Sequence, residues 1–257
     1  MANLTATQFG AMSTSQIAAL ATTAIAGLGA DDLAALTTRQ LASLTSEQIG
    51  ALTTTRIADL DATRLAALTT TEIAGLTSTQ VAALSATQIA SLATTQIAAL
   101  STAAVTGFDA TDLADLAATR FAALTSTQIG GLTTTQVAGL TETRVAALTT
   151  TQIAGLTATA VGALTETQVA ALGTRQVAAL TAVALQGLAA TRIDDFTTTQ
   201  IGALTTTQIA ALGTAAVTGL TATELEALTT TQLRALSAAR IGALTTTQSA
   251  GLSTSRI

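Results

Sequence analysis

The sequence predicts an all-α solenoid, or superhelix, of very short helices, with one helix in each eight-residue repeat. Three observations predict it: an apolar row that recurs every eight residues, a second apolar row five residues after the first, and helix-capping residues at a fixed position between them. The register runs without insertion or deletion through about 32 octads. Residues 1–257 are therefore expected to form a single continuous array with no internal boundary.

The two apolar rows set the period. The Leu row begins at position 4 and continues every eighth residue to Leu252, with Leu at 29 of its 32 sites. The Ile row begins at position 9 and holds Ile, Val, Leu or Phe at 31 of 32 sites, the exception being Ser249. In one continuous helix at about 100° per residue, these rows would rotate around the cylinder and leave no persistent apolar face. The helix must therefore break once in each octad.

Each break carries the signature of a helix start. Position 5 and its equivalents, the cap row, hold Ser, Thr or Asp at 25 of 32 sites, and these side chains accept hydrogen bonds from the first amides of a helix. Three residues later, in the Gln row, Gln or Glu occupies 18 of 32 sites. The two rows form capping boxes such as Thr5–Gln8, Thr77–Gln80 and Thr149–Gln152. Each octad is then a cap followed by about seven helical residues.

The octads must stack to be stable. An isolated eight-residue helix is too short to persist in water, so neighbouring octads have to close a common core. The two positions between the Ile row and the Leu row are mostly Ala or Gly, which allows a close approach of neighbouring helices. We expect Leu and Ile inside, with Leu100 and Leu148 fully buried, and Thr, Gln and Arg outside. The pattern does not give the number of octads per superhelical turn.

A β-solenoid with 16-residue coils is the alternative fold. Thr, Ile and Val favour strands, and two octads would make one coil. The two apolar rows differ by an odd number of residues, however, and would lie on opposite faces of a strand. Ala, Leu, Gln and Arg also favour helix.

The composition bears on function through the residue types that it lacks. The chain has no His, Cys or Lys, so neither transition-metal sites of the usual kind nor imidazole or thiol catalysis is expected. A net charge of −5 and only four aromatic residues oppose nucleic-acid binding. No apolar run is long enough for membrane insertion. We predict a non-enzyme with no catalytic, cofactor-binding or metal-binding residues, no cofactor and no small-molecule substrate.

Two sets of charged residues are candidates for binding sites. Acidic clusters could bind calcium, but none forms a calcium-loop motif, and solvated corners that aid solubility are the better interpretation. These clusters are Asp31–Asp32, Asp59 with Asp61, Asp109 with Asp112 and Asp115, and Asp194–Asp195. Arg replaces Gln in the Gln row at Arg56, Arg64, Arg120, Arg144, Arg192, Arg240 and Arg256. If that row were a surface stripe it could contact an acidic polymer, although the Arg spacing is irregular.

Tracts of the general form Leu-Thr-Thr-x-Gln-Ile-x-Ala-Leu, as in Leu68–Leu76 and Leu148–Leu156, resemble the repeats of large exported, adhesin-like bacterial proteins. The resemblance implies an extracellular or cell-surface stalk, fibre or spacer, although no signal-peptide pattern precedes the first octad. The register is open at both ends, so we expect copies of the chain to associate end to end into a rod or filament.

The alternative function is a binding module. Regular rows of Thr methyl and hydroxyl groups could order water at an ice surface, and the Ala- and Thr-rich composition loosely resembles that of alanine-rich helical antifreeze proteins. A protein partner could instead bind along the solenoid surface.

Overall fold

The computed structural model describes residues 5–188 and 192–252, and all of its regular structure within these residues is helical. No strand occurs in this part of the chain. The all-α solenoid of short helices is therefore confirmed, and the β-solenoid alternative is wrong. The Thr-rich segments that could have formed strands start helices instead, because their side chains are used for capping.

The chain divides into two compact units, Met1–Gln128 and Ile129–Ile257, which we describe separately. The prediction of one continuous array over residues 1–257 rests on the sequence register and stays a prediction. The helices are α1 (Ala6–Gly10), α2 (Thr14–Ala18), α3 (Thr22–Ala26), α4 (Ala30–Ala35), α5 (Thr38–Leu41), α6 (Ser46–Ala51), α7 (Thr54–Ala58), α8 (Ala62–Ala66), α9 (Thr70–Ile73), α10 (Ser78–Ala82), α11 (Ala86–Ser91), α12 (Thr94–Ala99), α13 (Thr102–Val105), α14 (Ala110–Asp115), α15 (Ala118–Ala122), α16 (Ser126–Gly130), α17 (Thr134–Ala138), α18 (Glu142–Ala147), α19 (Thr150–Ala154), α20 (Ala158–Ala163), α21 (Glu166–Ala170), α22 (Thr174–Ala179), α23 (Ala182–Leu185), α24 (Thr198–Gly202), α25 (Thr206–Ala211), α26 (Thr214–Gly219), α27 (Ala222–Ala227), α28 (Thr230–Arg234), α29 (Ala238–Gly242) and α30 (Thr246–Gly251).

Helix α19 shows how an octad begins. Thr149 has an extended backbone, and its hydroxyl oxygen accepts a hydrogen bond from the backbone N–H of Gln152 at 3.2 Å. The backbone N–H of Thr149 donates in return to Oε1 of Gln152 at 2.9 Å. This is the predicted capping box, and the boxes at Thr5 and Thr77 form in the same way.

The helices end sooner than predicted. Each spans four to six residues rather than about seven, because the Leu-row residue is not helical. At the end of α18, for example, Leu148 has an extended conformation (φ −60°, ψ 132°), and its N–H bonds to the carbonyl of Val145 at 3.2 Å. The Leu row therefore buries its side chains while its backbone carries the chain into the next cap. Helix and connection share the same eight residues.

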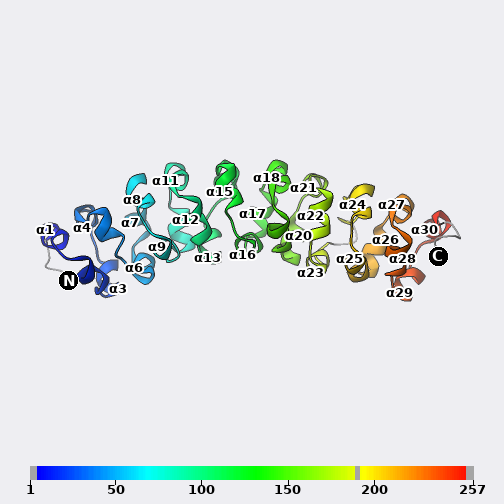
Figure 1. Ribbon diagram of the computed structural model, residues 1–257, viewed down its shortest axis with the longest axis horizontal. Helices are drawn as coiled ribbons and strands as arrows, with labels where there is room; N and C mark the ends of the chain where they lie inside the picture. Colours follow the sequence, from blue (N-terminus) through cyan, green and yellow to red (C-terminus); the bar gives the residue numbers. More distant parts are fainter. Residues whose placement is uncertain (1–4, 189–191, 253–257) are drawn as a thin grey trace. The chain divides into compact units, whose positions relative to one another are not determined.

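The core of each unit consists of the two apolar rows. Leu100 and Leu148 are 3% and 4% exposed, which confirms their predicted burial. Helices that pack together are three octads apart in sequence: α8 lies beside α11 in the first unit, and α24 beside the helix three octads later, α27, in the second (Figure 1). Hydrogen bonds join octads that are four apart, as from Gln200 to the carbonyl oxygens of Val169 and Leu172. Within each unit the superhelix therefore has between three and four octads per turn.

Glycines mark the closest helix approaches. No described glycine has a positive φ, so none is required by its own backbone conformation. A Cβ added at Gly50 would lie 3.0 Å from the carbonyl oxygen of Gly75, and one at Gly75 would lie 2.1 Å from the carbonyl oxygen of Ser46. Gly130 faces Gly155 in the same way in the second unit. The predicted role of the small residues, close packing, is confirmed at these sites.

Candidate functional site

The Gln row is the main polar feature of the core, and its predicted surface position is wrong. Its Gln side chains, apart from the first two, are almost completely enclosed; Gln48 and Gln80, for example, are each 1% exposed. The buried members are Gln40, Gln48, Gln80, Gln88, Gln96, Gln128, Gln136, Gln152, Gln168, Gln176, Gln200, Gln208, Gln232 and Gln248. A buried amide needs hydrogen-bond partners at both ends, and the structure provides them.

Gln200 shows the arrangement. Its Oε1 accepts a hydrogen bond from the N–H of Thr197, the cap of its own helix, at 2.8 Å. Its Nε2 donates to the carbonyl oxygens of Val169 at 2.9 Å and Leu172 at 2.7 Å, in the octad four places earlier. We call this arrangement a Gln latch: one side chain joins the N-terminus of one short helix to the C-terminus of another.

The latch recurs along both units with nearly constant geometry. The bond from Nε2 to the carbonyl oxygen of the Leu-row residue measures 2.5–2.7 Å at Gln48, Gln80, Gln88, Gln96, Gln128, Gln168, Gln176, Gln200, Gln208, Gln232 and Gln248. Gln40 makes the equivalent bond to Met12 at 2.7 Å. Such short helices leave most of their terminal backbone groups without an intrahelical partner. In an octad that carries it, such as that of Gln200 or Gln208, the latch satisfies one donor of this kind and brings Nε2 within hydrogen-bond distance of two or three carbonyl oxygens.

The first two octads lack this contact. Gln8 and Gln16 make their local capping boxes but have no octad four places earlier in this chain, and both are exposed. Met12, Leu20 and Leu28 are half-buried, in contrast to the buried Leu-row residues from Leu36 to Leu236. The same side chains are thus buried or exposed according to whether another octad lies against them.

Arg in the Gln row does not form a free surface stripe. An Nη atom of Arg64 donates to the carbonyl oxygens of Leu33 at 2.5 Å and Leu36 at 3.1 Å, and Nε of Arg120 donates to that of Leu92 at 2.6 Å. These Arg side chains thus replace the donor half of the latch. We expected this row to contact an acidic polymer only if it formed a surface stripe. The bonds of Arg64 and Arg120 to carbonyl oxygens of other octads do not support that expectation.

The other Arg residues of the row are placed as follows. Arg56 pairs with Asp59 at 2.5 Å and Arg192 with Asp195 at 2.7 Å. Arg144 and Arg240 are half-buried, and Arg256 lies outside the described residues.

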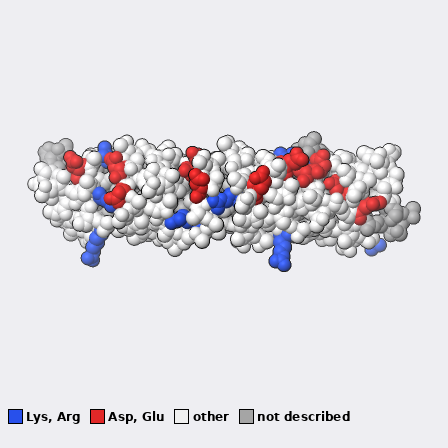
Figure 2. Space-filling view, turned by 90° about the horizontal axis from the view of Figure 1, so that it is seen from above, with Lys and Arg blue, Asp and Glu red and all other residues white. Residues whose placement is uncertain are grey.

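The acidic clusters mostly serve helix starts. The Asp61 carboxylate accepts the N–H of Arg64 at 2.8 Å, and the Asp32 carboxylate accepts the N–H of Gly29 at 2.9 Å. Asp31, Asp59, Asp61 and Asp194 are exposed. On the face drawn in Figure 2, charged side chains form small separate groups on a largely uncharged surface. Helix capping and solvation account for these clusters, in agreement with the sequence interpretation.

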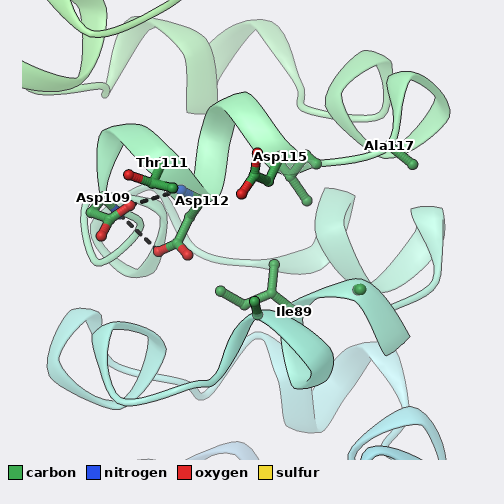
Figure 3. Close-up of a pocket in the computed structure, with 9 residues that line it drawn as sticks. Ile89, Asp109, Thr111, Asp112, Asp115 and Ala117 are labelled. Carbon is green, nitrogen blue, oxygen red and sulfur yellow. Dashed lines mark hydrogen bonds between the residues drawn. The ribbon is translucent and has the colours of Figure 1, made fainter.

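The third cluster lines a pocket of about 200 Å³ between α11 and α14 (Figure 3). Asp109 and Asp112 share a reciprocal pair of bonds: the N–H of Asp109 donates to Asp112 at 3.0 Å, and the N–H of Asp112 to Asp109 at 2.7 Å. Asp115 follows Ala90 by 25 residues, the same separation as in the close pair Gly50 and Gly75. Asp115 therefore occupies the same repeat position as Gly75, and its side chain lines the pocket.

Burial raises the pKa of Asp112, and the nearby charges of Asp109 and Asp115 raise it further, whereas the hydrogen bond from the Asp109 backbone lowers it. Among the described residues, no three Asp or Glu side chains are placed to share a metal ion. The predicted absence of cofactor and metal sites stays a prediction. No helix in the described ranges has the length and apolar character needed to cross a membrane.

The capping-box pattern does not reveal the latch, because a capping box accepts Gln and Glu equally. The row contains Gln at 16 sites but Glu at only two. That bias is the signal that could have revealed it, since only Gln can accept at one end of its side chain and donate at the other at neutral pH.

Comparison with known families supports a repeat protein. Three segments, residues 25–62, 57–94 and 145–182, match the ALTTAQ repeat. These segments resemble ALTTAQ repeats. Together they cover less than half of the chain, so the match shows similarity to this kind of repeat. Two of them contain a complete latch, Gln88 with Leu60 and Gln176 with Leu148. No curated protein matches the chain.

Proposed function

We propose that the chain is a structural repeat protein, a stalk, spacer or fibre element, and not an enzyme. The observation that carries this proposal is the Gln latch. The Gln side chains of the Gln row, from Gln40 onward, are buried in contacts between octads, as are most side chains of both apolar rows. A sequence whose repeated chemistry serves contacts with copies of its own repeat is suited to building a scaffold. The match to a repeat family agrees with this proposal.

The finer proposal is end-to-end association of copies outside the cell or at its surface, as in adhesin-like bacterial proteins. Gln8 and Gln16 present amide donors of the same kind that are latched elsewhere, beside the half-buried Met12 and Leu20. Octads near the other end of a second copy carry the matching carbonyl and apolar groups, because every octad has the same pattern. Such a contact joins different surfaces and does not need to close, which is the geometry of filaments. Antibody labelling of intact source cells tests the location.

The assembly is tested by light scattering over a range of concentrations, with electron microscopy of the products. We expect concentration-dependent filaments. The double variant Gln8→Glu/Gln16→Glu keeps both capping boxes but removes the donors, and should raise the assembly concentration about tenfold. Thr134→Ala/Thr150→Ala, at exposed sites remote from these Gln residues, is the matched control and should assemble like the wild type. A chain that stays monomeric at high concentration would refute the filament.

Ice binding is the second candidate, favoured by the exposure of the Thr triplets. All three members of Thr133–Thr135 are exposed, as are those of Thr205–Thr207 in a later octad. The first Thr of each triplet also caps a helix, which by itself accounts for that residue without ice binding. Thermal hysteresis measured on monomeric protein decides between the candidates, because a spacer should show none.

A further inference from the structure

Glu72 occupies the Gln row at a fully buried site. It is 1% exposed. One carboxylate oxygen accepts a hydrogen bond from the N–H of Thr69 at 2.5 Å, which is the contact that the amide oxygen of a Gln makes in the other octads. In a Gln latch the other terminal atom is the amide nitrogen, which donates to the octad four places earlier. For Glu72 that octad is residues 37–44, and the equivalent acceptors are the carbonyl oxygens of Leu41 and Leu44.

An ionised Glu72 cannot make this contact. A carboxylate has no hydrogen to donate, and its second oxygen would face carbonyl oxygens that also carry negative partial charge. A protonated carboxyl group has one hydroxyl hydrogen and can donate to one of the two carbonyls. Because the Leu-row carbonyl accepts the shortest bond in the latches at Gln80 and Gln128, we expect Leu44 to be the acceptor.

No described cation compensates a charge at this site. Helix α9 packs against α6 and α12. Helix α6 carries only the exposed Glu47, and α12 carries no charged residue. On the octad that holds the target carbonyls, Arg39 is exposed. The preceding Gln-row residue, Arg64, is bonded to carbonyls of the octad before residues 37–44.

We propose that Glu72 forms a proton-dependent latch, which closes onto residues 37–44 when its carboxyl group is protonated and is lost when that group ionises. The permanently closed form of the same contact is available as Glu72→Gln, which restores the predominant residue of the row. The inference concerns a pH-responsive point within the array and does not depend on the function proposed above.

The direction of the pH dependence follows from burial. Desolvation raises the pKa of Glu72 above its ordinary value of 4.5, against the lowering effect of the hydrogen bonds with Thr69. The folded chain therefore binds this proton more tightly than the unfolded chain does. Stability from this site is fully present below the ordinary carboxyl pKa and is lost as the pH rises through the raised value.

The test is hydrogen exchange of the intact chain, wild type against Glu72→Gln, at about pH 4 and about pH 8. The readout is the segment 37–44, whose sequence is identical in both proteins, so that intrinsic exchange rates cancel at each pH. At the higher pH we expect this segment to be about tenfold better protected in Glu72→Gln. At the lower pH the two proteins should agree within about twofold.

Two further measurements make the test decisive. Segment 145–182 in the second unit should exchange equally in both proteins at both pH values, since damage in a repeat array stays local. Carbon-13 NMR of the Glu carboxyl groups should show Glu72 titrating above the ordinary value of 4.5. A protection ratio that is the same at both pH values, or a Glu72 carboxyl that titrates at the ordinary value, would overturn the proposal.

Discussion

One side chain, the buried Gln, explains much of the sequence pattern. The oxygen of Gln200 caps its own helix, and its nitrogen caps the end of another through carbonyl groups that lie 28 and 31 residues earlier in the chain. Net stabilisation by one such hydrogen bond is only about 1 kcal/mol, but a buried carbonyl left without a donor costs about 1–3 kcal/mol. The row therefore tolerates Arg, which keeps a donor, as at Arg64 and Arg120.

Gln200→Glu tests the donor half of the latch. The substitution keeps the acceptor for the Thr197 N–H but leaves the carbonyls of Val169 and Leu172 without their donor. We expect a loss of about 1–3 kcal/mol in the free energy of unfolding at neutral pH. Denaturant unfolding followed by circular dichroism measures it.

Gln16→Glu is the matched control, since Gln16 has the same capping box and is exposed. At concentrations where the chain is monomeric, it should change stability by less than about 0.5 kcal/mol. Equal effects at both positions would mean that the latch contributes nothing measurable.

The element scale is set by the octad, in which a helix of four to six residues and its connection occupy the same eight positions. Cap and apolar rows predicted the helix starts correctly, because N-capping depends on residues within one turn. The helix ends were placed too late, because the Leu row has high helix propensity and its extended backbone is imposed by packing. Local sequence could not show that the Leu carbonyl serves a distant octad.

Substituting Ala for Gly75 and for Gly242 distinguishes the effect of close packing on stability from the effect of helix propensity. Ala at position 75 would place its Cβ 2.1 Å from the carbonyl oxygen of Ser46, a backbone atom that cannot turn aside. We expect Gly75→Ala to destabilise the protein by about 1–3 kcal/mol. Gly242 has nothing within 4 Å of an added Cβ and ends helix α29, so Gly242→Ala should be neutral or stabilise by up to about 1 kcal/mol.

Thermal unfolding of the two variants measures these effects. Gly75→Ala should lower the melting temperature, whereas Gly242→Ala should leave it unchanged or raise it, although the chemical change is the same. A Gly75→Ala protein as stable as the wild type would show that the helices at this contact can separate without cost.

At the scale of the whole molecule, the order of contacts within each unit follows from counting octads. Helix packing at three octads and hydrogen bonds at four give a superhelix with a non-integral number of octads per turn. The sequence predicted the stacking, but the number per turn depends on how closely the small residues let helices approach, and every octad gives the same local signal. The sequence did not predict the acidic pocket either, because Ala90 and Asp115 come to line the same pocket only after the chain has made most of a turn.

The equivalence of octads predicts that whole repeats can be removed but fractions cannot. Deleting residues 149–156 removes one octad, and Gln168 then has residues 125–132 four octads before it, with Ile129 and Leu132 supplying the two carbonyls. We expect this chain to keep its helical circular dichroism spectrum and to melt cooperatively within a few degrees of the wild type, since only one of about 32 similar octads is lost.

Deleting residues 149–152 removes half as much chain but shifts the following rows by half an octad relative to those before. At the junction, Ala160 then stands in the Leu row, Thr157 in the Ile row and Leu156 in the Gln row, and the superhelix cannot close across it. Loss of several buried apolar side chains at about 2–5 kcal/mol each should open the array there, with reduced helicity and a separate transition at lower temperature. If the half-octad deletion melted like the whole-octad deletion, the stacking would not depend on register, and the latch could not be what aligns one octad with another.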